Sequence, residues 1–238
     1  VHVLRAPGGC PWDAAQTHLS IRRNFLEEAY EACEALDCDD EAMLREELGD
    51  VLLQVLFHAD IEADRGRMTI DDIADAECRK LIFRHPFLFG GERASWDELK
   101  KQEKGQKTTG EAMQGVARSL PATWRAEKIQ KKAAKTGFCW ESAGQALDKL
   151  AEEAQELREA VRDNTNIDEE LGDMLFAAVR VASTLDKDPE QALHSACEKF
   201  IRRFTAMEQS ILAEGRTLEE VSREELLASW DAQKRNGR

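Results

Sequence analysis

Two groups of carboxylates stand at helical spacing in the first quarter of the chain. Glu27 and Glu31 are four residues apart with Glu28 beside them, and Glu47 and Asp50 begin 16 residues later. Residues three or four apart share one face of a helix, so each group can present its oxygens together. Carboxylates gathered from two packed helices repel one another unless protons or cations neutralise them. Because only oxygen ligands are offered, the cation we expect is Mg²⁺.

The same spacing occurs again in the second half of the chain. Glu152, Glu153 and Glu156 repeat the first acidic group 125 residues later, and Glu170 and Asp173 repeat the second group after 123 residues. A single acidic group of this kind is more often a solvated helix face. Two groups that occur twice in the same order indicate an internal duplication instead.

Two further motifs are duplicated in the same order. Each half carries a Lys/Arg pair four residues apart, followed by a Trp/Lys pair four residues apart. These residues are Lys80, Arg84, Trp96 and Lys100 in the first half and Lys199, Arg203, Trp230 and Lys234 in the second. Packing requires apolar periodicity, whereas most of these residues are charged. The duplicated motifs therefore indicate a shared chemistry.

Carboxylates, cations and tryptophan together form a receptor for a polyphosphate. The acids would hold Mg²⁺, which bridges phosphate oxygens and polarises the phosphorus. Lys199 and Arg203 would neutralise charge on the leaving phosphates, and Trp230 could stack on a base. Glu152, or its counterpart Glu27, would accept the proton of an attacking water. The spacing leaves open which phosphorus is attacked.

Composition indicates the class of protein that positions these groups. Of 238 residues 34% are charged, and strand-forming residues are sparse, so we expect an all-α protein. The net charge of −14 argues against nucleic acid or an anionic membrane as the main partner. The longest apolar run is far too short to span a membrane. Six cysteines without a C-x-x-C pair suggest neither zinc nor disulfides, which fits a cytoplasmic protein.

Periodicity and capping signals divide the chain into two helical modules, residues 1–100 and 119–238, joined by a polar linker at 101–118. In the first module we expect helices at about 15–36, 41–64, 69–85 and from 96. In the second we expect them at about 120–135, 143–162, 165–185, 189–215 and from 222. The apolar run 51–57 predicts that the second helix is buried on most sides.

These motifs resemble those of the MazG family of nucleoside triphosphate pyrophosphohydrolases. The resemblance rests on GGCPWD at 8–13, QTH at 16–18, NFLEEAYE at 24–31, EELGDVLLQV at 46–55 and the second set, and it covers almost the whole chain. It implies tandem all-α pyrophosphatase modules, each a helical bundle completed by homodimerisation. The implied activity converts nucleoside triphosphates to monophosphate and diphosphate with Mg²⁺, or Mn²⁺ as a substitute. Broad base preference and a role in nucleotide-pool clean-up are implied with it.

The resemblance also implies residue roles. The metal ligands would be Glu153, Glu156, Glu170 and Asp173 in the second module and Glu28, Glu31, Glu47 and Asp50 in the first. The duplicated Lys/Arg and Trp/Lys pairs would hold the nucleotide. The first Lys/Arg helix ends at His85-Pro86 whereas the second continues, so we favour the second module as catalytic.

Other interpretations fit parts of the pattern. A di-iron carboxylate bundle uses Glu-x-x-His pairs, which this sequence lacks. A non-enzymatic helical adaptor would bind no Mg²⁺ and would tolerate loss of Lys199 and Arg203. Trp12 and Trp140 are expected as packing anchors rather than base contacts, and His58 as a packed histidine.

Overall fold

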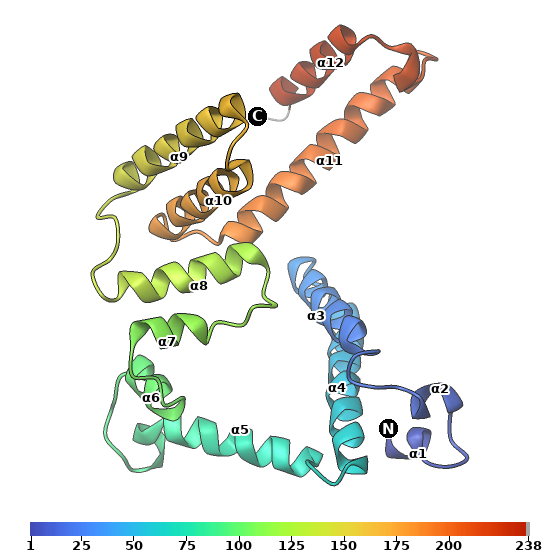
Figure 1. Ribbon diagram of the computed structural model, residues 1–238. Helices are drawn as coiled ribbons and strands as arrows, with labels where there is room; N and C mark the ends of the chain where they lie inside the picture. The colour runs from blue at the N-terminus through green and yellow to red at the C-terminus, as the bar shows by residue number, and fades with distance from the viewer. Residues whose placement is uncertain (237–238) are drawn as a thin grey trace. The chain divides into compact units, whose positions relative to one another are not determined.

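The structure is a computed structural model that describes residues 1–236, with every side chain in that range except those of Asp97 and Asn236. Figure 1 shows a succession of helices, and no strand occurs among the described residues. The all-α class predicted from composition is confirmed. The chain folds as two compact units, Val1–Gln102 and Glu103–Arg238.

The first unit is built on a hairpin of α3 (Arg22–Asp37) and α4 (Glu41–Asp64). Asp40 caps α4 by accepting hydrogen bonds from two backbone N–H groups of its first turn. The predicted bounds of α4 are confirmed. Helix α3 begins later than predicted because Ser20 Oγ accepts the Thr17 N–H at 2.8 Å and closes a turn before the helix.

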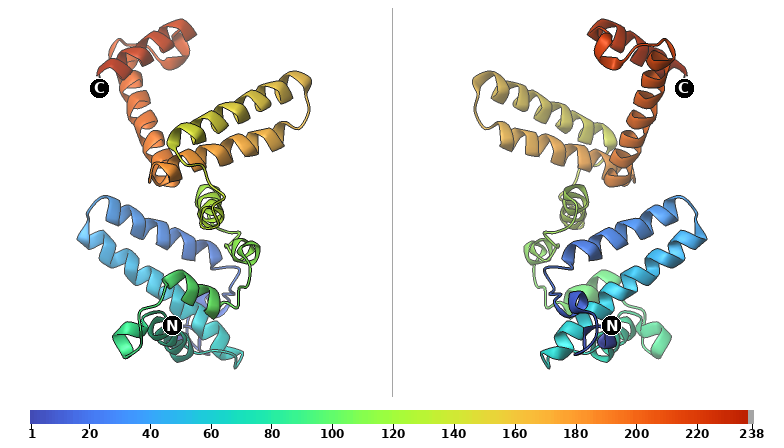
Figure 2. Two further views of the ribbon diagram at one scale, coloured as in Figure 1. Left: turned by 90° about the vertical axis from the view of Figure 1, so that its left-hand side faces the viewer. Right: turned by 90° about the vertical axis from the view of Figure 1, so that its right-hand side faces the viewer.

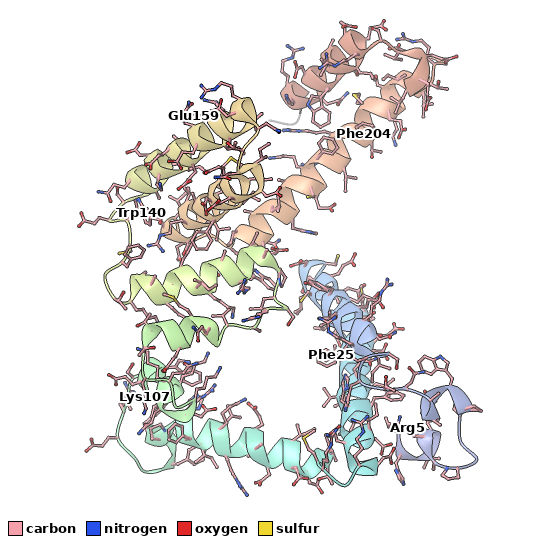
Figure 3. All side chains as sticks on the ribbon, in the orientation of Figure 1. Arg5, Phe25, Lys107, Trp140, Glu159 and Phe204 are labelled. Carbon is pink, nitrogen blue, oxygen red and sulfur yellow. The ribbon has the colours of Figure 1, made fainter. Side chains whose placement is uncertain are left out.

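Two short helices, α1 (His2–Arg5) and α2 (Pro11–Ala14), precede the hairpin. The Arg5 guanidinium donates to Asp60 at 2.8 Å and to Asp64 at 2.6 Å, and thereby fixes α1 on α4 (Figure 3). Neither short helix was predicted, because four residues are too few to show a helical period.

The first unit continues with α5 (Ile70–Arg84), the 3-10 turn η1 (Pro86–Phe89) and α6 (Trp96–Glu103). Thr69 and Asp72 form a capping box at the start of α5, as the sequence predicts. The end of α5 before a proline is likewise confirmed.

The second unit repeats the hairpin plan. Its helices are α7 (Thr109–Gln114), α8 (Ala122–Ala134), α9 (Ala143–Asp163), α10 (Ile167–Thr184), α11 (Pro189–Ala213) and α12 (Arg223–Asn236), with the 3-10 turn η2 (Leu218–Glu220) before α12. Helices α9 and α10 form the hairpin, and α8 packs against α10 and α11. Figure 2 shows that α11 diverges from this hairpin. A small core of Met207, Ile211 and Val221 joins α11 to the segment before α12.

The segment expected to be a solvated linker contains structure of its own. Helix α7 lies within residues 101–118 and begins with a capping box of Thr108 and Glu111. Ala112 and Val116 are buried, and α7 packs against α8. We therefore correct the expectation of a tether with almost nothing to bury, because two small apolar residues suffice to dock this short helix.

Large apolar side chains remain uncovered on the hairpins. Leu48 and Leu52 of α4 are 54% and 57% exposed, so the prediction that this helix is buried on most sides is wrong for the single chain. Leu175 on α10 and Phe200 on α11 are exposed to a similar degree. Among the described residues, none of the helices combines the length and apolarity that crossing a membrane requires. Exposed apolar faces of this kind are typical of surfaces that contact other proteins or ligands.

Candidate functional site

The second unit gathers the carboxylates that the sequence singles out. Glu153 of α9 and Glu170 and Asp173 of α10 each place an oxygen within 4.8 Å of the others. Glu153 is buried, at 8% exposure. A hydrogen bond with Glu153, then burial and the Glu153 charge, raises the pKa of Glu156. All four predicted metal ligands of this unit are thus brought together.

A lysine that sequence reasoning missed lies in the same cluster. Lys149 Nζ donates to Glu152 at 2.7 Å and to Glu153 at 2.8 Å. These two hydrogen bonds raise the pKa of Lys149 well above its ordinary value. Its spacing of four residues before Glu153 was the available signal. The first unit has Asn24 at the corresponding position, four residues before Glu28.

The first unit forms a matching cluster. Glu28 of α3 and Glu47 and Asp50 of α4 place their oxygens within 4.8 Å of one another. Burial, followed by the charges of Asp50 and Glu31, raises the pKa of Glu28. Burial and the charge of Glu31 raise the pKa of Glu47 in the same way. The four predicted ligands therefore converge in this unit as well.

The two residues predicted to accept a proton lie at the edges of these clusters, each paired with a cation. Glu152 is held by Lys149, as described above. Glu27 accepts from Arg23 at 2.7 Å, one helical turn earlier on α3. Each is therefore oriented by a neighbour on its own helix.

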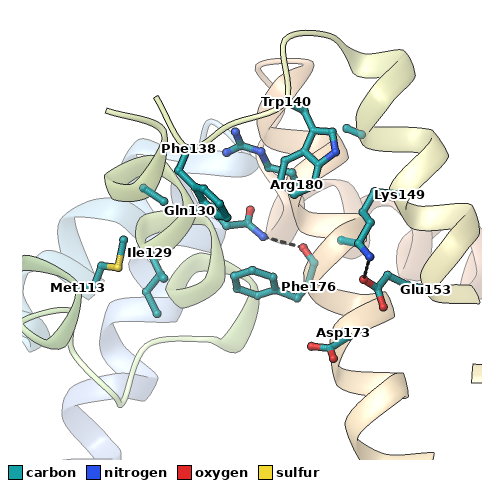
Figure 4. A pocket seen from close by; sticks show the side chains of 13 residues that line it. Met113, Ile129, Gln130, Phe138, Trp140, Lys149, Glu153, Asp173, Phe176 and Arg180 are labelled. Atoms are coloured by element: carbon teal, nitrogen blue, oxygen red, sulfur yellow. Dashed lines mark hydrogen bonds and ion pairs between the residues drawn. The ribbon is translucent and has the colours of Figure 1, made fainter. Parts of the chain in front are cut away.

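A cavity of about 310 Å³ lies beside the carboxylates of the second unit (Figure 4). Glu153 and Asp173 form part of its lining, and Trp140, in the loop between α8 and α9, forms another part. The Arg180 guanidinium carbon lies 5.7 Å from the centre of the Trp140 ring. Trp140 thus packs on Arg180, and it also faces this cavity. Sequence reasoning did not identify the cavity, because its walls come from residues far apart in the chain.

Two of the predicted nucleotide-binding residues of the first unit, Arg84 and Trp96, lie side by side. The Arg84 guanidinium carbon lies 5.3 Å from the centre of the Trp96 ring. Lys80, one turn before Arg84 on α5, pairs with Glu77. Lys100 is exposed on α6.

In the second unit the corresponding residues lie along α11 and α12. Lys234 Nζ is 5.9 Å from the centre of the Trp230 ring. The centre of the Trp230 ring lies 5.0 Å from that of Phe200, a residue of α11 that stands between Lys199 and Arg203 in the sequence. Trp230 also packs against the small core at the end of α11. The structure therefore gives Trp230 a packing partner.

Three of the predicted phosphate-binding cations, Lys80, Lys199 and Arg203, are not paired with the carboxylates of their own unit in the described chain. Within the described part of the chain, no hydrogen bond or ion pair joins Lys199 or Arg203 to the cluster of α9 and α10, and none joins Lys80 to the cluster of α3 and α4. In the described chain, the cluster of α9 and α10 is therefore not paired with Lys199 or Arg203, and the cluster of α3 and α4 is not paired with Lys80.

Comparisons with known proteins match both halves. The sequence model of the MazG nucleotide pyrophosphohydrolase domain matches residues 16–89 and 142–206, the segments that carry the two clusters. The chain is 42% identical over 235 residues to the nucleoside triphosphate pyrophosphohydrolase/pyrophosphatase MazG of Thermotoga maritima, covering 97% of this chain and 91% of that protein. It is 41% identical over 245 residues to the nucleoside triphosphate pyrophosphohydrolase of Escherichia coli strain K12, covering 98% and 93%.

Proposed function

Because the chain belongs to the MazG family of nucleotide pyrophosphohydrolases, we propose that it converts nucleoside triphosphates to monophosphates and diphosphate in a reaction that depends on Mg²⁺. Family membership makes it a hydrolase that acts on acid anhydrides. The observation that carries the proposal is the carboxylate cluster, which occurs in both units with the same residue types and the same spacing within each helix.

The carboxylates fit a hard divalent cation. They offer only oxygen atoms, and a hydrogen bond with Glu153, then burial and the Glu153 charge, raises the pKa of Glu156. Glu153, Glu156, Glu170 and Asp173 would hold Mg²⁺, with Mn²⁺ as a substitute, and the first-unit carboxylates would do the same. When bound, the ion supplies charge neutralisation and polarisation of the attacked phosphorus.

The chain's own residues supply the remaining chemistry. Glu152 accepts the proton of the attacking water, and Lys149 orients its carboxylate for that transfer. Lys199 and Arg203 hold the phosphate oxygens and offset the charge that develops on the leaving diphosphate. In the first unit Glu27, Lys80 and Arg84 take these positions, and Trp96 and Lys100 correspond to Trp230 and Lys234.

We propose a homodimer, because large apolar side chains on α4, α10 and α11 are exposed in a single chain. Leu48 and Leu52 of α4 and Leu175 of α10 would be covered by a second copy. In such a dimer, the Lys/Arg helix of one chain could approach the carboxylates of the other. Helix-interior glycines at 49 and 172, whose missing side chains would meet no atom of this chain, are consistent with close approach by a partner or substrate.

We favour the second unit as the catalytic one. It has Lys149 where the first unit has Asn24, and a cavity adjoins its carboxylates. Its Lys/Arg helix α11 is also the longer of the two. The first unit would then act mainly as a scaffold. Broad base preference, a role in clearing the nucleotide pool and a cytoplasmic location belong to the same proposal.

Product analysis tests the proposed reaction. The protein is incubated with a panel of ribo- and deoxyribonucleoside triphosphates, with Mg²⁺ or with EDTA, and the products are separated by anion exchange. Monophosphate with diphosphate, lost in EDTA, is the expected result. Nucleoside diphosphate with phosphate would overturn the reaction. No turnover of any nucleotide would favour the helical adaptor instead.

A further inference from the structure

We propose that the cavity beside the carboxylates of the second unit holds the nucleobase of the substrate, and that Gln130 and Arg180 read its polar edge. The inference rests on the proposed function, because it assigns the part of the nucleotide that the metal cluster does not bind. The cavity, about 310 Å³, lies at the lower end of the range of small-molecule pockets. That volume suits a base better than a whole nucleotide.

Two buried polar atoms at this cavity lack a partner. Gln130 is 6% exposed and Arg180 is 9% exposed. Within the described part of the chain, Gln130 Oε1 and Arg180 Nε make no hydrogen bond. Buried polar groups are nearly always paired, so each such atom calls for an explanation. Here a ligand can provide both partners.

The orientation of the Gln130 amide is fixed by a hydrogen bond across the fold. Its Nε2 donates to the Phe176 carbonyl at 2.7 Å, a contact drawn in Figure 4. The amide oxygen is therefore the atom left over, and it can only accept. Arg180 Nε can only donate. The ligand must accordingly offer an N–H group and an acceptor.

The duplication shows that the fold does not require arginine at position 180. Seven residues after Asp50 the first unit has Phe57, and seven residues after Asp173 the second unit has Arg180. Phe57 is 5% exposed and packs with Ile21 and Ile61 in the core of its unit. An apolar side chain thus satisfies this position in one hairpin, so a buried arginine in the other has a reason beyond packing.

The remaining walls suit a flat ring. Phe138, Trp140 and Phe176 line the cavity, and Figure 4 shows them around the space next to Gln130. Aromatic faces bind planar heterocycles by stacking. Glu153 and Asp173 belong to the same lining, so the phosphates of a nucleotide would lie at the metal cluster while its base lies inside. Trp230, in contrast, already packs on Phe200.

A pair of substrates that differs in one hydrogen-bond donor tests the role of Gln130. Purine riboside triphosphate is ATP without the 6-amino group that would donate to Gln130 Oε1. We expect kcat/KM for ATP to exceed that for purine riboside triphosphate by about tenfold, since the analogue leaves a buried acceptor unpaired. Gln130→Met should bring the ratio close to one. An unchanged ratio in Gln130→Met, or no preference in the wild type, would overturn the proposal.

Matched variants separate recognition from folding. Gln209→Met, at an exposed position of α11, should keep the wild-type ratio. Arg180→Met should lower kcat/KM for both substrates by similar factors, because both retain the ring acceptors. Mn²⁺ affinity and the thermal unfolding midpoint show whether each variant is folded. If Gln130→Met unfolds, Gln130→Leu is used for the same ratio.

Binding of nucleosides without phosphates separates this inference from the proposed reaction. Adenosine should quench tryptophan fluorescence more strongly than purine riboside does, and Trp140→Phe should remove most of the quenching. Adenosine binding with this pattern supports the cavity even if no triphosphate is hydrolysed. Hydrolysis to monophosphate and diphosphate without nucleoside binding or substrate discrimination would leave the reaction standing and remove the cavity as a base site.

Discussion

The ammonium of Lys149 lies 2.8 Å from the carboxylate of Glu153, inside the cluster that we assign to a divalent cation. Lys149 therefore competes with the metal for Glu153. We expect Lys149→Asn, which copies Asn24 of the first unit, to bind Mn²⁺ about tenfold more tightly, because a like charge near the ion is removed. Its turnover should fall, since Glu152 loses the partner that orients it. Titration calorimetry and kcat measure the two effects, and Arg158→Asn serves as a control at an exposed position.

Removing one carboxylate from each unit tests which unit is catalytic. Glu153→Ala should lower kcat by about a hundredfold or more, because the metal loses a buried ligand. Glu28→Ala should leave kcat within about twofold, if the first unit acts as a scaffold. Steady-state kinetics on the two purified variants makes the comparison. Loss of turnover in Glu28→Ala with activity retained in Glu153→Ala would reverse the assignment.

Adding and removing Mg²⁺ should change stability. Burial, followed by the charges of Asp50 and Glu31, raises the pKa of Glu28, so a bound cation should stabilise the folded state. At a hundredfold excess over Kd, one site contributes about 2.7 kcal/mol. Thermal unfolding with Mg²⁺ and with EDTA measures the effect. Glu153→Gln combined with Glu28→Gln should remove most of it, and an equal Mg²⁺ shift in that double variant would contradict the assignment.

The pair formed by His58 on α4 and His18 in the turn before α3 should make the first unit sensitive to pH. The ring nitrogens of His18 and His58 lie 2.7 Å apart, and burial followed by the charge of His18 lowers the pKa of His58. The folded state therefore binds this proton less readily than the unfolded state, whose pKa is about 6.5. Stability should be fully present above pH 6.5 and fall as pH drops below it. The unfolding midpoint should decline less between pH 7.5 and 5.5 in His58→Asn.

Glu62 affects stability only at lower pH, so its titration does not interfere with the measurement on His58. Hydrogen bonds from His18 and Arg67 lower the pKa of Glu62 to about 2. Its contribution is present above the unfolded pKa of about 4.3 and is lost only as pH falls toward 2. The window between pH 7.5 and 5.5 therefore isolates His58. A decline of equal size in wild type and His58→Asn would exclude the histidine as its source.

A charge on the exposed apolar face should disrupt the proposed homodimer. Leu175 is 56% exposed on α10. Leu175→Lys should shift the mass in light scattering from about twice 26.8 kDa to 26.8 kDa at micromolar concentration. Gln191→Lys adds the same charge at an exposed polar position and should remain dimeric. A wild-type protein that is already monomeric would remove the dimer from the proposal.

Local signals predicted most of the fold. The capping box of Thr69 and Asp72 marks a helix start that the structure confirms, because capping depends on residues within one turn. The carboxylate clusters were also predictable, since duplication aligned residues at helical spacing. Contacts between distant segments cannot be predicted in the same way, so the apolar run of α4 predicts a buried helix although Leu52 is exposed.

The cavity lay beyond such reasoning. Gln130 meets Phe176 across 46 residues of sequence, and no spacing rule connects them. From the sequence alone, an arginine on an apolar helix is expected to face the solvent, whereas packing buries Arg180. Lys149 was missed for a different reason: a lysine one turn from two glutamates is usually a surface pair, and only the burial of Glu153 sets it apart.

Phe57 and Arg180 occupy the same place in the two repeats, one as a core side chain and the other as a buried cation without a full set of partners. A gene that carries two copies of one fold can let them diverge in what each contributes. The first copy keeps an apolar side chain at this position, where it packs in the core with Ile21 and Ile61. The second carries a buried polar group without a hydrogen-bond partner, because natural recognition sites often give up some stability for selectivity. Duplication of this kind lets one repeat maintain fold stability while the other provides substrate recognition within a single polypeptide.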